Sequence, residues 1–125
     1  MSHFTVLVVG DDPESLLAPY DENLQTETGR NAYMWTPNPE AKWDGWVVGG
    51  RWSGNLRRLD GYGSSQVKRR DLDVSATSPT YAFLSADGWR DVEEYDDDDA
   101  WADTWRDLVR ASPLDATLTL IDCHI

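Results

Sequence analysis

Residues 42–54 read KWDGWVVGGRWSG, and they place three of the seven tryptophans of the chain beside four glycines. Apolar residues recur here with a period of two, which is typical of a β-strand and not of a helix. The adjacent Gly49 and Gly50 suit a two-residue hairpin turn, because both positions of such a turn need positive φ. The stretch therefore predicts two short antiparallel strands; one long strand with a glycine bulge is the alternative.

The predicted hairpin has two different faces. Trp43 and Trp52 fall on a face that is entirely apolar or small, as expected of core residues. Asp44, Trp46 and Arg51 fall on the opposite, mixed face, which suits contact with a ligand or partner because tryptophan and arginine are enriched where proteins bind. These three residues are the ones in the stretch that need a functional reason.

Before this stretch the sequence predicts a strand, a short helix and a long connection. Residues 4–9, FTVLVV, are β-branched or aromatic at nearly every position, as in a central strand buried on both faces. Asp12 and Pro13 then supply a helix cap and a first helical residue, and Pro19 ends the helix. Residues 21–41 show no period and form an irregular connection.

After the stretch, a basic connection over residues 57–79 leads into a second hairpin at residues 80–92, TYAFLSADGWRDV. Its turn is predicted at Asp87 and the glycine that follows. Tryptophan and leucine at helical spacing predict a helix over residues 100–111. ATLTLIDCHI, residues 116–125, then predicts the last strand.

The predicted order is strand, helix, two hairpins, helix, strand, within a single domain spanning residues 1–125. This order indicates an α+β fold in which two helices cover one mainly antiparallel sheet. We expect a ferredoxin-like sandwich with a βαββαβ core and extra hairpin strands. In that topology the first and last strands are antiparallel neighbours, which brings His3 close to His124.

The composition is that of a globular domain. The 125 residues are 40% hydrophobic and 27% charged, and they contain no apolar run long enough to cross a membrane. The N-terminal residues do not resemble a signal peptide, so we expect a cytoplasmic protein. Cys123 is the single cysteine, which excludes an internal disulfide and a cysteine-based metal site. We expect no cofactor.

Charge is distributed unevenly along the chain, whose net charge is -12. Residues 51–70 hold six basic residues and one acid, a charge of +5, whereas the other 5 basic and 22 acidic residues give -17. A field this negative repels nucleic acid and anionic lipid and attracts basic protein surfaces. Direct nucleic-acid binding is therefore not expected. The acidic run at residues 93–99 lacks the glycine and terminal glutamate of an EF-hand, and a solvated turn before a helix is its simpler interpretation.

Two groups of residues could support catalysis or hold a metal. Asp11 and Asp12 follow the first strand and would either cap the helix or bind a divalent cation. Asp122 and His124 share one face of the last strand, with His3 expected across from them, and could act as a general base or as metal ligands. Neither group has a diagnostic spacing, and no nucleophile elbow, P-loop or paired CxxC occurs in the sequence.

A ligand site is a further possibility in the middle of the chain. The indole of Trp46 offers a face on which a nucleobase could stack. Arg51, with Arg57 and Arg58 after it, offers cationic donors for a phosphate. A nucleotide or another phosphorylated small molecule would suit this combination, whereas a protein partner would suit the same tryptophan and arginine as interface residues.

Four segments of the chain, MSHFTVLVVG, APYDEN, KWDGWVVGGRWSG and the terminal DCHI, carry a resemblance. They are similar to a family of small uncharacterised bacteriophage proteins with an MSHFTVLVIG start, a KWDWYxxGGRWxG centre and a VDCHI end. In this chain Gly45 and Trp46 stand where the family tends to have Trp-Tyr. The resemblance implies an origin in a phage or prophage and carries over no catalytic residues.

These features predict an acidic, phage-encoded, non-enzymatic protein of the host cytoplasm. Its predicted role is to bind and modulate a host or anti-phage-defence protein that presents a basic surface. The alternatives are a nucleotide-type small-molecule binding protein and a metal-dependent hydrolase. No association with a membrane is expected.

Overall fold

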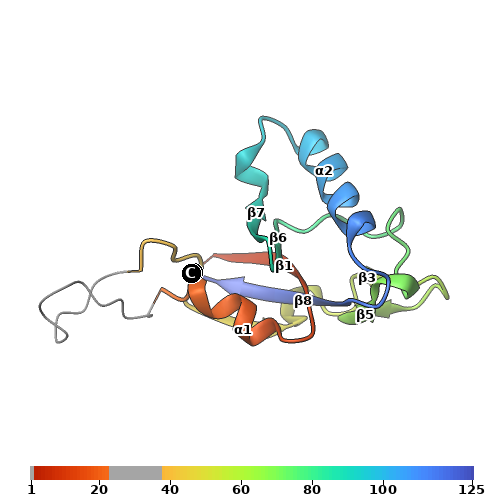
Figure 1. Cartoon of the computed structure of the whole chain (residues 1–125), viewed down its shortest axis with the longest axis horizontal. Helices are drawn as coiled ribbons and strands as arrows, with labels where there is room; N and C mark the ends of the chain where they lie inside the picture. The colour runs from red at the N-terminus through yellow and green to blue at the C-terminus, as the bar shows by residue number, and fades with distance from the viewer. Residues whose placement is uncertain (1, 23–37) are drawn as a thin grey trace, which may run out of the picture.

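A computed structural model describes residues 2–22 and 38–125 of the chain. Within these residues, one mixed and mainly antiparallel sheet carries an α-helix on each of its faces (Figure 1). The predicted α+β class is therefore confirmed. The sheet strands lie in the order β2-β8-β1-β6-β7, and β5 also pairs with β8.

The elements have the following bounds. The strands are β1 (His3–Val9), β2 (Gly45–Val48), β3 (Leu56–Arg57), β4 (Gly63–Ser64), β5 (Gln66–Lys68), β6 (Ala82–Ser85), β7 (Gly88–Asp91) and β8 (Thr117–His124). The helices are α1 (Pro13–Leu17) and α2 (Asp98–Ala111), with 3₁₀ turns η1 (Ala18–Tyr20), η2 (Gly50–Trp52), η3 (Arg69–Asp71) and η4 (Val92–Glu94).

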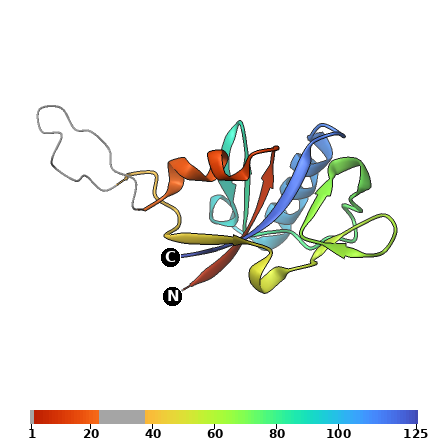
Figure 2. The ribbon, with the colours of Figure 1, turned by 90° about the horizontal axis from the view of Figure 1, so that it is seen from below.

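Strand β1 lies in the middle of the sheet, as its sequence predicts. It pairs antiparallel with β8 over its whole length and parallel with β6 from Val6 to Val8. Val6, Leu7 and Val8 have no exposed surface, because both faces of the strand are covered. The two ends of the chain lie side by side at one end of this strand pair (Figure 2).

The alternation of β1 divides the core into two clusters. Leu7 and Val9 face α2, where they pack with Trp105. Val6 and Val8 face the other way and pack with Leu17 of α1. Figure 1 accordingly shows α2 above the sheet and α1 below it. We call these two sides the α2 face and the α1 face.

The predicted ferredoxin-like arrangement is not confirmed. In a split βαβ unit another strand lies between the two parallel strands. Here the parallel strands β1 and β6 are direct neighbours, and the two helices cover opposite faces. The confirmed class is thus α+β with a mainly antiparallel sheet.

The prediction of a hairpin turn at Gly49 and Gly50 is wrong. Both glycines do have positive φ, 75° and 51°, but the chain continues into the 3₁₀ turn η2, where the N–H of Trp52 bonds to the carbonyl of Gly49. The single long strand is not formed either, because β2 ends at Val48. β2 instead pairs with the free edge of β8, a partner that is more than 70 residues away in sequence.

Strands β2 and β5 follow one another along the same edge of β8. β2 ends its ladder with Val48 opposite Ile121, and β5 starts with Gln66 opposite Thr119. Between them, Leu120 accepts a hydrogen bond from the N–H of Gly49 and donates one to the carbonyl of Ser65, both at 2.8 Å. The chain therefore leaves the edge of β8 and returns to it at a single residue.

The second hairpin and the long helix are confirmed, with shifted boundaries. β6 and β7 form the hairpin, and Ser85 pairs with Gly88, so the turn lies one residue earlier than predicted. Helix α2 starts two residues earlier, because the Asp97 carboxylate accepts the N–H of Ala100 at 2.7 Å and caps the helix. The short helix α1 starts at Pro13, as predicted.

Candidate functional site

A polar cluster lies where the ends of β1, β2 and β8 meet. We define it as His3, Asp44, Asp122 and His124. The register places His3 directly opposite His124, as predicted, and the two ring centroids are 5.6 Å apart. The fold thus brings together candidate residues from the start, the middle and the end of the chain.

Asp122 is the buried centre of this cluster, with 5% of its side chain exposed. Its Oδ1 lies 2.8 Å from Nδ1 of His3, and its Oδ2 accepts the backbone N–H of Arg51 at 3.0 Å. Burial opposes the charge of this carboxylate, but the hydrogen bonds from Arg51 and His3 outweigh burial and lower the pKa of Asp122. Asp122 is therefore an ionised acceptor that ties β1 and η2 to β8.

Asp44 and His124 form the second pair of the cluster. Asp44 Oδ1 and His124 Nδ1 are buried and lie 2.5 Å apart, a contact that is an ion pair when the imidazole is protonated. The contact does not have the geometry of a hydrogen bond, and neither atom has another hydrogen-bond partner among the described residues. Gly45 makes room for the imidazole, because a Cβ at that position would overlap the His124 ring.

This arrangement can orient an imidazole. A carboxylate only accepts hydrogen bonds, so the Nδ1 of His3 must be the donor to Asp122. In the neutral imidazole, Nε2 then carries the free lone pair and can accept a proton or a hydrogen bond. The described residues contain no group of three His, Cys, Asp or Glu side chains placed to hold a metal ion.

Asp11 and Asp12 lie at the opposite end of β1 from His3. Asp12 caps α1: its carboxylate accepts the Ser15 hydroxyl at 2.6 Å and the Ser15 N–H at 3.2 Å. The hydroxyl first, and then the N–H, lower the pKa of Asp12. Asp11 is exposed. The geometry of Asp12 is that of a helix cap.

The structure places Trp46 and the arginines of the predicted ligand site apart. Trp46 packs on the α1 face, edge-on to Trp43 with 6.5 Å between ring centroids. Arg51 belongs to η2, which lies over Asp122 on the α2 face. Arg58 forms an ion pair with Asp60 at 3.1 Å. The exposed Arg57 follows η2 along the chain, in β3.

Three cations of the basic segment have structural partners. The side chains of Lys68, Arg69 and Arg70 donate to backbone carbonyls of Asp115, Val109 and Leu114, at 3.0, 2.8 and 3.3 Å. These carbonyls lie at or just beyond the end of α2, where the helix dipole favours positive charge. Part of the +5 segment therefore holds the helix in place.

The sequence did not reveal an apolar groove between the β6–β7 hairpin and the end of α2. It encloses about 480 Å³, and Val9, Phe83, Leu108 and Pro113 are among its lining residues. These residues come from β1, β6, α2 and the segment after α2, which only the tertiary fold brings together, so no local pattern marks the groove.

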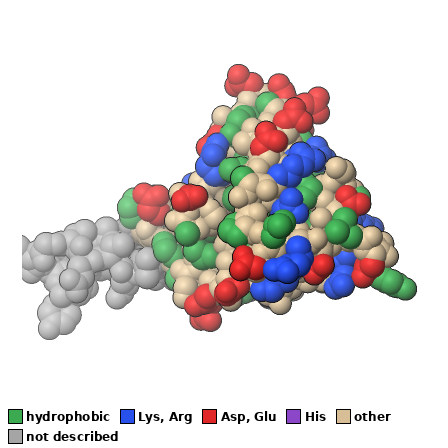
Figure 3. Space-filling model, turned by 45° about the vertical axis from the view of Figure 1, so that its right-hand side comes forward, with side chains coloured by type: hydrophobic (Ala, Val, Ile, Leu, Met, Phe, Trp, Pro, Cys, Tyr) green, Lys and Arg blue, Asp and Glu red, His purple; other side chains and the backbone are tan. Residues whose placement is uncertain are grey.

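Exposed acidic residues gather on and before α2. We call this set the acidic ridge; it consists of Asp96, Asp97, Asp98, Asp99, Asp103 and Asp107. Figure 3 shows acidic side chains collected at the top of the molecule, where η4 leads into α2. The acidic run of the sequence is thus a surface, and Asp97 within it also caps the helix.

The described residues therefore define an α+β fold with a half-buried Asp-His cluster around the buried Asp122, an apolar groove and an acidic ridge. Comparisons with protein-family models, with curated proteins and with solved structures found no match to this chain. Across residues 2–22 and 38–125, none of the helices has the length and apolar character needed to traverse a bilayer.

Proposed function

We propose that this protein is an acidic, non-enzymatic binding protein encoded by a phage. Its partner is a host or anti-phage-defence protein that presents a basic surface in the host cytoplasm. The phage origin rests on the resemblance of the four sequence segments. The observation that carries the binding role is that the apolar groove and the acidic ridge share one helix, α2.

Helix stability explains only part of the charge of the ridge. Asp98 and Asp99 lie in the first turn of α2, where the helix dipole favours acids, and Asp107 pairs with Arg110 at 3.9 Å. Asp99, Asp103 and Asp107 are exposed and recur every four residues, so each carboxylate lies next to a like charge. Each such pair destabilises a helix by about 0.2–0.5 kcal/mol. The cap is already supplied by Asp97. The repulsion between neighbouring carboxylates of this row is relieved when the row binds a basic partner.

The groove supplies what the ridge lacks, an apolar contact. Interfaces depend on a few desolvated apolar anchors, whereas exposed charges mainly steer the encounter. Leu108 lines the groove directly after Asp107, and Asp87 lines it from the hairpin. A partner segment that has an apolar side chain between basic residues therefore fits this surface.

The alternative of a nucleotide site receives less support. Trp46 and η2 lie on opposite faces of the sheet, and three cations of the basic segment, Lys68, Arg69 and Arg70, bond to carbonyls of the chain itself. A stacking face and free cationic donors are therefore not brought together around Trp46.

The proposal is tested by removing the same number of negative charges from two different places on the surface. A ridge variant carries Asp99→Asn, Asp103→Asn and Asp107→Asn. A control variant removes three exposed acids elsewhere, through Asp11→Asn, Glu14→Gln and Asp115→Asn. Each protein is used for affinity capture from a bacterial lysate at low salt, and each captured protein is then purified and titrated against all three forms.

We expect the ridge variant to bind the purified partner about tenfold more weakly than the wild type, with a smaller salt dependence. The control variant should bind the partner about as tightly as the wild type does, although its net charge is the same as that of the ridge variant. Equal weakening of both variants, equal binding by all three, or no captured protein at low salt contradicts the proposal.

A further inference from the structure

A second concave site lies at the start of β1, on the other side of β7 from the groove. β1 pairs with β6 only from Val6 onward, so its first residues border an opening in the sheet. The cavity there encloses about 330 Å³. We call it the His3 cavity; its lining includes His3, Phe4, Lys42, Tyr81, Trp89 and Glu93.

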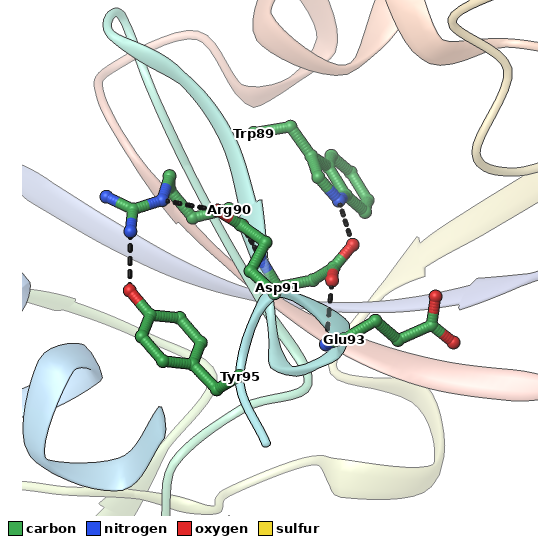
Figure 4. Close-up of polar contacts among 6 residues, drawn as sticks. Trp89, Arg90, Asp91, Glu93 and Tyr95 are labelled. Carbon is green, nitrogen blue, oxygen red and sulfur yellow. Dashed lines mark hydrogen bonds and ion pairs between the residues drawn. The ribbon is translucent and has the colours of Figure 1, made fainter. Parts of the chain in front are cut away.

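Aromatic rings form one wall of the His3 cavity. Phe4 lies 5.3 Å from Tyr81 and 6.2 Å from Trp89 between ring centroids, and Tyr20 packs behind Trp89 at 5.1 Å. The Trp89 indole is held in place, because its Nε1–H donates to Asp91 at 3.0 Å. Figure 4 shows Trp89 and Asp91 on one side of β7 and Arg90 on the other. Electron-rich ring faces of this kind attract cations.

Carboxylates form a second part of the lining. Asp91 is buried and accepts the N–H of Glu93 at 2.9 Å in addition to the indole of Trp89, while the Glu93 side chain is exposed. Burial, and then a hydrogen bond to Glu93, raise the pKa of Tyr81, so its hydroxyl stays protonated. Lys42 contributes one positive charge against the two negative charges of Asp91 and Glu93. The titratable side chains of the cavity therefore favour a positive ligand.

His3 adds a third kind of acceptor. Asp122 holds Nδ1 of His3 as a hydrogen-bond donor, so Nε2 is the ring nitrogen left to contact a ligand. The exposed Glu93 carboxylate of the cavity can only accept hydrogen bonds, and Nε2 of His3 accepts one when it carries no proton. A ligand that carries several N–H donors and a positive charge satisfies them.

We propose that the His3 cavity binds a small organic cation, in which an amidinium, guanidinium or ammonium group is attached to an apolar body. The charged group lies among Glu93, His3 and the aromatic wall, and the apolar body packs against Phe4 and Trp89. This inference stands apart from the proposed function, because the groove lies on the other side of β7 and the acidic ridge lies on and before α2.

The test uses three probes that share one ring and differ in charge: benzamidinium, neutral benzamide and anionic benzoate. Each is titrated into the full chain at neutral pH and followed by NMR chemical shifts and by calorimetry. We expect benzamidinium to bind about tenfold more tightly than benzamide, and benzoate to bind most weakly. Tighter or equal binding of benzamide or benzoate, or no saturable binding of benzamidinium, overturns the proposal.

A pair of variants locates the bound cation. Glu93→Gln removes one charge from the cavity, and Asp103→Asn removes one from the exposed surface of α2. Glu93→Gln should weaken benzamidinium binding about fivefold and leave benzamide binding unchanged, whereas Asp103→Asn should change neither. Equal weakening by the two variants places the cation on the acidic surface in general and also overturns the proposal.

Discussion

His3 and Asp122 join the first and last strands of the sheet through a side-chain contact of 2.8 Å. The second oxygen of Asp122 binds the backbone N–H of Arg51, so one carboxylate connects β1, β8 and η2. This carboxylate is nearly inaccessible to solvent, and both of its oxygens have partners. Its charge is therefore part of what holds this end of the sheet together.

We expect Asp122→Asn to lower the free energy of unfolding by about 1–2 kcal/mol at neutral pH, because charge-assisted hydrogen bonds become neutral ones. Urea denaturation measures this value. The pKa of Asp122 is lowered in the folded state, so its contribution is complete above the unfolded pKa of about 3.9 and is lost as the pH falls through the lower folded pKa.

The wild type should accordingly lose stability more steeply below about pH 4 than Asp122→Asn does. Asp11→Asn is the control, since Asp11 is exposed and lies at the far end of β1. Parallel stability curves for the wild type and Asp122→Asn through the acid range would show that this carboxylate has no such role.

Gly50 allows η2 to lie against Asp122. Its φ is 51°, and an added Cβ would lie 2.6 Å from Cβ of Asp122. Gly54 also has positive φ, 78°, but a Cβ there meets nothing within 4 Å. We expect Gly54→Ala to cost about 1 kcal/mol from backbone strain alone, and Gly50→Ala about 3 kcal/mol or more, because Asp122 must also move.

Chemical denaturation of the two alanine variants separates the effects of strain and overlap. Both substitutions introduce the same side chain at positive φ, so the difference in cost reports the contact with Asp122. Equal costs would mean that η2 can move away from β8 without a loss of stability.

Thr80 anchors two tryptophans of α2. Its carbonyl accepts the indole N–H of Trp101 and its hydroxyl accepts that of Trp105, both at 2.8 Å. We expect Thr80→Val to lower the free energy of unfolding by about 2 kcal/mol, because the buried Trp105 N–H loses its partner. Thr80→Ser keeps a hydroxyl and should cost less than about 1 kcal/mol. Equal stability of the two variants, measured by tryptophan fluorescence in urea, would contradict this role.

Cys123 should be unreactive in the folded protein. It has no exposed surface, and burial, followed by the charge of Asp122, raises the pKa of its thiol to about 12. Because the thiolate is the reactive form, labelling with a disulfide reagent at mildly alkaline pH should be slow for the native chain. Labelling should be complete within the same period in denaturant. Rapid stoichiometric labelling of the native chain would show that this end of β8 opens readily.

The elements that the sequence predicts well have local signals. FTVLVV, residues 4–9, indicates a strand buried on both sides whatever packs against it. Trp101 and Trp105 mark the buried side of α2, and both are buried in the structure. The alternation of the last strand places Asp122 and His124 on one face, and its pairing with β1 then brings His3 near them.

The remaining features depend on contacts that no local pattern contains. Gly49 and Gly50 do adopt positive φ, as a hairpin turn requires. β2 nevertheless pairs with the edge of β8 that faces away from β1, and not with the residues that follow the two glycines. A strand buried on both faces also does not show which helix covers which face, so the opposite placement of α1 and α2 could not be read from β1. The His3 cavity is hidden for the same reason, since Lys42, Tyr81 and Trp89 meet only in the fold.

The meeting of β2 and β5 at Leu120 has a consequence for how this sheet can vary. Residues 45–49 and 66–68 follow β8 in one unbroken register, so the edge is architecturally a single strand made from two pieces of chain. Residues 50–65 are an excursion from that strand, anchored by η2 against Asp122 and by the buried Leu56. Insertions and grafted sequences are therefore best accommodated at the exposed residues 59–62 of this excursion, away from the two ladders with β8.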